Sequence, residues 1–298
     1  MPTLKAGELF PQTLVSEMFS KVQGHSTLAK LSDQTPIPFA GIEQFVFNLD
    51  GNAQIVGEGE QKKEGTATVT SKIIKPLKFV YQARVTDEFV NCAEEKRIQY
   101  LQAFADGFSK KIAEAFDIAA IHGLEPKSLT KASSFHDTNS FDGLVDTTVP
   151  YNAAEIDANI ETAVTGVVGL GFNVNGLALS PAAGGALAAL KDANRASIFP
   201  EFRFGQNPDA FYGMKSDINR TLVVNSEAAE KDHAIVGDFQ NMFKWGYAEN
   251  IPMEIIEYGD PDQTGRDLKA YNEILLRAEA YIGWGILDKT AFARVKEA

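Results

Sequence analysis

The 298-residue sequence contains a single cysteine, Cys92, and only four histidines. One thiol excludes an intrachain disulfide and any zinc site built on several thiolates. No window approaches the roughly 18 consecutive apolar residues of a membrane-spanning helix, and the first residues lack the apolar stretch of a signal peptide. We therefore expect a protein that folds without covalent cross-links, has no membrane partner and stays in the cytosol unless a larger assembly carries it elsewhere.

Basic side chains are also scarce. The sequence has 28 Lys and Arg against 40 Asp and Glu, which gives a formal net charge of −12. A surface of this charge repels the nucleic-acid backbone, so a generic DNA-binding surface is excluded. The share of hydrophobic residues, 44%, is typical of a folded globular protein and excludes a disordered or fibrous chain.

Recognisable catalytic and cofactor motifs are missing as well. Residues 169–176 resemble a dinucleotide-binding fingerprint, but Val174 stands where its third glycine belongs, and the run follows a predicted helix instead of a strand. We interpret the run as a helix C-terminus and turn. The four histidines lack the spacing of metal ligands, and Cys92 lacks a nucleophile signature. We predict no catalytic, cofactor-binding or metal-binding residues.

Residues 260–265 begin like a calcium-binding loop, with side-chain oxygens at positions one, three and five and glycine at position six. Position twelve is Tyr271 where a calcium loop has a bidentate glutamate. We therefore favour a capped turn over a calcium site.

The first part of the chain predicts extended structure. Prolines interrupt residues 1–50, which we expect to form an arm with a short helix over 13–22. Segments 41–56 and 66–85 alternate apolar and polar residues around a polar run, which predicts a long β-hairpin. A two-stranded ribbon is only marginally stable alone, so its apolar side chains need another surface, which we expect to be another chain. These side chains are Ile55, Val69, Ile73, Ile74, Phe79 and Tyr81.

A long helix and an α/β unit follow. Apolar residues at spacings of three and four predict one helix over residues 94–122, with Gly123 as its left-handed C-cap. At about 1.5 Å per residue this helix is roughly 43 Å long. Ser180 and Pro181 fit the first turn of a later helix. The further elements we expect are helices over 153–168 and 181–190 and strands over 173–179, 221–224, 234–236, 253–258 and 273–282.

The order of these parts resembles the major capsid proteins of tailed phages, which have the Hong Kong 97-like fold. The resemblance covers nearly the whole chain, and five runs carry it: Gly57-Glu58-Gly59-Glu60 at the hairpin tip and residues 84–89, 189–192, 236–239 and 276–281. It implies an α+β fold with an N-terminal arm over 1–50, an extended hairpin over 51–85, a peripheral domain over 86–148 and 268–298 with a spine helix at 94–122, and an axial α/β domain over 149–267.

The resemblance implies a structural shell protein and not an enzyme. Copies of the chain would form hexamers and pentamers of an icosahedral head that encloses double-stranded DNA without sequence-specific binding. Assembly in the host cytoplasm, a place in the virion capsid, and scaffolding, portal and decoration proteins as partners are implied as well. The arm and hairpin would contact neighbouring subunits through these candidate residues: Phe10, Glu58, Glu60, Lys62, Lys63, Lys72, Lys75 and Lys78.

The sequence departs from two patterns seen in some members of this family. An arm follows Met1 directly where those members begin with a helical scaffolding segment, so we expect either a separate scaffolding protein or a chain that is already processed. Residues 273–298 contain no asparagine for an isopeptide bond to a hairpin lysine, so we expect non-covalent contacts. Two alternatives stay open, which are an encapsulin-like shell around enzyme cargo and a soluble α/β enzyme that uses the turn at 169–176.

Overall fold

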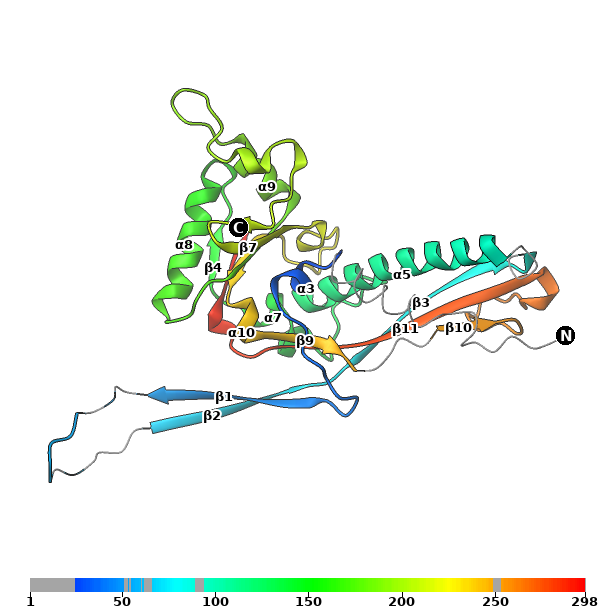
Figure 1. Ribbon diagram of the computed structural model, residues 1–298, viewed down its shortest axis with the longest axis horizontal. Helices are drawn as coiled ribbons and strands as arrows, with labels where there is room; N and C mark the ends of the chain where they lie inside the picture. Colours follow the sequence, from blue (N-terminus) through cyan, green and yellow to red (C-terminus); the bar gives the residue numbers. More distant parts are fainter. Residues whose placement is uncertain are drawn as a thin grey trace.

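A computed structural model describes residues 25–50, 53, 55–59, 61, 66–88, 94–248 and 253–297 of the chain. The molecule has three parts, which are a projecting two-stranded ribbon, a long helix lying along a sheet, and a second sheet flanked by helices (Figure 1). The predictions for residues 1–24, including the helix over 13–22, and for Cys92 lie outside the described residues.

The long helix, α5, runs from Glu94 to His122, so its predicted bounds are confirmed. Gly123 ends the helix with a φ of +64°, and its N–H donates to the Ala119 carbonyl at 3.0 Å. This left-handed cap is a conformation that glycine adopts without a steric cost. The buried face repeats every three to four residues and includes Leu101, Phe108, Ile112 and Phe116.

Helix α5 lies along an antiparallel sheet (Figure 1). The strands of this sheet are β3 (Leu77–Thr86), β9 (Phe243–Tyr247), β10 (Met253–Ile256) and β11 (Glu273–Ile286). β11 is central, because it pairs with β3 on one edge and with β10 and β9 on the other. Phe116 of α5 packs against Trp245 and Trp284 of this sheet, with ring centres 5.5 and 5.7 Å away. The predicted strand over 273–282 is confirmed and continues to Ile286.

A mixed six-stranded sheet forms the core of the other unit. In spatial order its strands are β4 (Thr148–Pro150), β12 (Phe292–Lys296), β8 (Asp232–Gly237), β5 (Gly176–Leu179), β7 (Met214–Ile218) and β6 (Ala210–Phe211). Helices α8 (Ile156–Gly169) and α9 (Pro181–Ala189) pack on it. The Ser180 hydroxyl accepts from the Ala183 N–H at 3.1 Å and caps α9 as predicted. Gly171, with a φ of +89°, turns the chain after α8, which confirms the interpretation of residues 169–176 as a turn.

Short helices connect these parts. They are α3 (Thr27–Leu31), α6 (His136–Asn139), α7 (Phe141–Leu144), α10 (Phe239–Met242) and 3-10 helices at Ala153–Glu155, Pro200–Gly205, Arg220–Leu222, Lys269–Tyr271 and Lys289–Ala291. The predicted strand over 221–224 is wrong. The Asn219 side chain accepts from the Thr221 N–H at 3.2 Å and starts a 3-10 turn there.

The projecting ribbon consists of β1 (Ile42–Asp50) and β2 (Thr66–Ile74), paired antiparallel. The prediction of one hairpin arm through Val85 is wrong beyond the end of β2. Pro76 has no N–H to donate and interrupts the strand, and the chain continues as β3 in the sheet beside α5. β1 lies within the residues predicted to form the arm, so the hairpin extends to the N-terminal side of residue 51.

Candidate subunit interface

The base of the β1–β2 hairpin is anchored to the rest of the chain. Ile74, at the end of β2, is 1% exposed. A Cβ added at Gly285 of β11 would lie 2.7 Å from its Cγ1, so the glycine gives Ile74 the room to pack there. The Lys72 ammonium donates to the Thr138 carbonyl, and burial lowers the pKa of Lys72. These contacts fix the angle at which the hairpin leaves the body (Figure 1).

Beyond its base, the hairpin presents apolar side chains to solvent. The register pairs Glu43 with Ile73 and Phe45 with Ser71. Directly paired residues lie on the same face of the ribbon, and so do residues two apart in one strand. Phe45, Val69 and Ile73 therefore lie on the same side of the ribbon. Their exposed fractions are 58%, 50% and 58%. This face has the character of a docking surface.

Two of the apolar residues expected to need another chain are instead buried within this one. Ile74 lies against β11, and Phe79 of β3 is 9% exposed, with its ring 6.2 Å from that of Trp284. The break at Pro76 explains the difference, because it places both side chains at the junction with the body. Ile55 and Tyr81 are exposed as expected.

The charged contact candidates have different environments. Glu58 lies in an exposed turn, and Lys75 is exposed. Lys78 forms an ion pair with Glu279 at 2.7 Å, and its pKa is raised by the hydrogen bond to that carboxylate. Lys72 and Lys78 thus contact their own chain. The other candidates lie outside the described residues, and these are Phe10, Glu60, Lys62 and Lys63.

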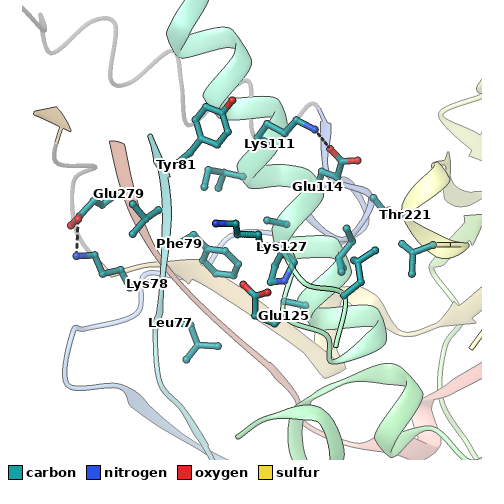
Figure 2. A pocket seen from close by; sticks show the side chains of 18 of the residues that line it. Leu77, Lys78, Phe79, Tyr81, Lys111, Glu114, Glu125, Lys127, Thr221 and Glu279 are labelled. Atoms are coloured by element: carbon teal, nitrogen blue, oxygen red, sulfur yellow. Dashed lines mark hydrogen bonds and ion pairs between the residues drawn. The ribbon is translucent and has the colours of Figure 1, made fainter. Parts of the chain in front are cut away.

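A groove of about 1240 Å³ lies between β3 and α5 (Figure 2). Phe79 and Tyr81 of β3 line one wall, and ion pairs of Lys78 with Glu279 and of Lys111 with Glu114 stand at its margins. β3 is the last strand of its sheet, and within the described residues no strand pairs with its outer edge. An open strand edge beside an apolar groove can accept an extended segment of another chain.

The loop at residues 260–266 contains its own cation. Nη2 of Arg84, on β3, lies within hydrogen-bond distance of Asp260 at 2.8 Å, Asp262, Thr264 at 2.6 Å and the Arg266 carbonyl at 3.0 Å. These are the ligand positions one, three, five and seven of a calcium loop. The guanidinium nitrogen therefore stands where calcium would bind, and its hydrogen bond lowers the pKa of Asp262. The capped turn favoured from the sequence is confirmed, because Asp260 also accepts from two backbone N–H groups of the loop.

A serine, a histidine and a glutamate that are far apart in the sequence contact one another, but the two ring nitrogens are interchanged relative to a hydrolase triad. His233 Nδ1 lies 3.1 Å from the Ser180 hydroxyl, and His233 Nε2 lies 3.4 Å from the Glu297 carboxylate. Ser180 is fully buried and already caps α9, so its oxygen is not presented to a substrate. The Tyr151 ring covers the imidazole, with 3.7 Å between the ring centres. The arrangement is a packed polar contact, and the separation of its members leaves no sequence signal.

Arg294 of β12 lies at the centre of a buried ion-pair cluster. Its guanidinium donates to Asp232 at 3.0 Å, Asp142 at 2.7 Å and Glu230 at 2.6 Å. Within the described part of the chain these carboxylates are close enough together to hold a metal ion, but the guanidinium binds all three of them. Burial raises the pKa of Asp232 to about 7 against the opposing charge of Arg294. The cluster went unpredicted from the sequence because its members come from three distant segments.

Comparison with known proteins identifies phage capsid proteins as relatives of this chain. The model of the Phage capsid family matches residues 6–296. The chain is 23% identical to the probable major capsid protein gp17 of Mycobacterium phage D29, over 97% of this chain and 90% of that protein. The corresponding protein of Mycobacterium phage L5 is 24% identical, over 97% and 89%.

Solved structures agree with this result. A structure from Mycobacterium phage Ogopogo is 30% identical with a TM-score of 0.77 and covers 92% of each chain. One from Gordonia phage Cozz is 26% identical with a TM-score of 0.72, over 92% of this chain and 87% of the other. The predicted Hong Kong 97-like α+β capsid fold is thereby confirmed, and the encapsulin-like alternative is not favoured. Within the described residues, no helix combines the length and apolar character needed to span a bilayer. The chain belongs to the phage capsid family, whose members build the shell of the virion.

Proposed function

We propose that copies of this protein assemble into hexamers and pentamers and so build the icosahedral head of a tailed phage. The projecting hairpin carries the proposal, because Phe45, Val69 and Ile73 expose apolar surface that a neighbouring copy can cover. Fully burying side chains of this kind contributes about 1.5–3 kcal/mol each. The hairpin therefore gains its stability from a neighbouring copy and links the two.

The groove between β3 and α5 is the second contact surface in this proposal. Its open strand edge suits an extended segment from a neighbouring copy, and its paired charges fix the register of that segment. Assembly takes place in the host cytoplasm, with scaffolding, portal and decoration proteins as partners. The division into arm, hairpin, peripheral and axial domains is part of the same proposal, with the hairpin taken from β1 to β2 and β3 placed in the sheet beside α5.

Double-stranded DNA is the proposed content of the shell. A formal charge of −12 per copy disfavours tight binding of the wall to phosphates, so the DNA is enclosed and not bound by sequence. Nuclease-protected DNA in purified particles would support this content. Enzyme cargo in its place would support the encapsulin-like alternative.

Electron microscopy of the chain expressed alone tests the assembly. We expect closed shells or ring-shaped capsomers, whereas a chain that stays monomeric at high concentration would contradict self-assembly without a scaffolding protein. Ile73→Asp should abolish particles while the subunit still folds, because it places a charge on the docking face. Thr68→Asp is the matched control, because Thr68 is exposed on the opposite face of the same strand. Equal particle yields from both variants would contradict the assigned face.

A further inference from the structure

The ring of His122 is buried between two groups that can only accept hydrogen bonds. Its Nδ1 lies 2.8 Å from a carboxylate oxygen of Asp142, and its Nε2 lies 2.8 Å from the carbonyl oxygen of Thr221. A neutral imidazole carries one N–H and one bare nitrogen. Satisfying both acceptors therefore requires a proton on each nitrogen, so the geometry describes His122 as a buried imidazolium.

The other three histidines carry no such requirement. The His233 ring faces the Ser180 hydroxyl, which can itself donate, and a carboxylate of Glu297. A neutral His233 satisfies both partners. His136 contacts its neighbour Asp137, and His25 is exposed. His122 is thus the histidine whose contacts depend on its charge.

The position of His122 gives this charge a mechanical role. The residue is the last of α5, Asp142 lies on α7, and Thr221 lies in the 3-10 helix at Arg220–Leu222 that leads toward the six-stranded sheet. Asp142 also accepts from Arg294 of that sheet. The protonated ring therefore ties the end of the long helix to the second unit.

The charged groups around the ring come from every element packed on it. Asp142 bonds the ring directly, and Asp232 of β8, Arg294 of β12 and Glu230 lie behind it in the ion-pair cluster. On the helix itself Asp117 accepts from the Thr221 hydroxyl at 3.2 Å. These acids outnumber the neighbouring cation Arg294, so the electrostatic environment favours the protonated form of His122.

We propose that His122 is a proton-dependent latch, in which the protonated ring holds the end of α5 against the second unit and loss of a proton releases it. Releasing the proton leaves a nitrogen lone pair facing either the Asp142 carboxylate or the Thr221 carbonyl. That contact becomes repulsive. The Asp142 carboxylate keeps its hydrogen bonds from Arg294 and from the Glu230 N–H. The Thr221 carbonyl, in contrast, loses the donor that the ring supplied. The junction then opens, and the angle between helix and sheet is no longer fixed.

The sign of the pH dependence follows from the same contacts. Although burial lowers it, the Asp142 carboxylate raises the pKa of His122 above the ordinary 6.5. The latch is fully closed below pH 6.5 and weakens as pH rises toward the folded-state pKa, by up to tenfold in the opening equilibrium per pH unit. Burial raises the pKa of Asp117 and of Asp232 to about 7, and both acids act in the same direction at lower pH. Because both carboxyls are still losing protons near pH 7, a variant that lacks the imidazole is needed to isolate the contribution of His122.

Hydrogen exchange on assembled particles tests the latch. We expect amide exchange of residues 117–122, corrected for its intrinsic pH dependence, to increase severalfold between pH 7 and 9. His122→Gln should remove this increase, and His233→Gln should preserve it. Exchange that is independent of pH in the wild type would overturn the proposal.

A second measurement needs no variant. Exchange of the imidazole C2 hydrogen, followed by mass spectrometry, gives the titration midpoint of each histidine in the intact particle. We expect the midpoint of His122 to lie above 6.5. A midpoint below 6.5 would show that the ring is neutral at neutral pH and would refute the latch.

Discussion

Replacing Arg294 by alanine tests the buried ion-pair cluster. The variant leaves the Asp142 and Asp232 carboxylates, which are 2% and 0% exposed, without their guanidinium partner. Removing one partner of a buried ion pair costs about 3–5 kcal/mol when the remaining charge stays uncompensated. This applies to Asp232, because Asp142 keeps its contact with His122. The folding equilibrium constant should therefore fall by roughly a hundredfold to a few thousandfold.

Urea unfolding of dissociated subunits measures this loss through the fluorescence of the two buried tryptophans, Trp245 and Trp284. Arg220→Ala is the matched control, because that side chain is 67% exposed and pairs with Glu114 at 2.5 Å. An exposed pair contributes at most about 1 kcal/mol. The loss of folding free energy in Arg294→Ala should be smaller at pH 5 than at pH 8. At pH 5 the Asp232 carboxyl is protonated, so less buried charge is left without the guanidinium. Equal stabilities of the two variants would refute the reasoning and show that water reaches the cluster.

Three further predictions use the same preparation. Phe116→Ala should lower the free energy of unfolding by about 3–5 kcal/mol, since it empties the space between two tryptophan rings, and a loss below 1 kcal/mol would contradict this packing. Arg84→Ala should make the loop at 260–266 sensitive to calcium, so that millimolar calcium raises the melting temperature of the variant and not of the wild type. Added salt should increase the yield of assembled particles in light scattering, because each copy carries −12, and dissociation on adding salt would point instead to dominant ion pairs between subunits.

Local patterns in the sequence were sufficient for several elements. The apolar spacing and Gly123 define both ends of α5, and Ser180 with Pro181 defines the start of α9. These features depend on residues within a turn or two of one another, where helix geometry acts directly. The same is true of the turn after α8.

Features that depend on distant partners were not predictable in this way. The alternation over residues 66–85 predicts one strand, although Pro76 is a local signal of a break. Only the pairing of β3 with β11 shows that the chain enters another sheet there. The ion-pair cluster joins residues up to 152 positions apart, so no spacing in the sequence reveals it. The sequence predicts that the hairpin needs a partner surface. Only the register of β1 with β2 shows which of its apolar side chains share one face.

Strand β11 has a consequence for how the shell wall bears force. It runs beside α5 and pairs with β3 residue by residue from Glu273 to Ile282 (Figure 1). A tension directed along these strands loads all of their interstrand hydrogen bonds at once. The bonds therefore have to break together. The same tension applied across the strands would break the bonds one after another. A wall whose subunits are pulled along β11 therefore resists internal pressure in its mechanically strongest direction.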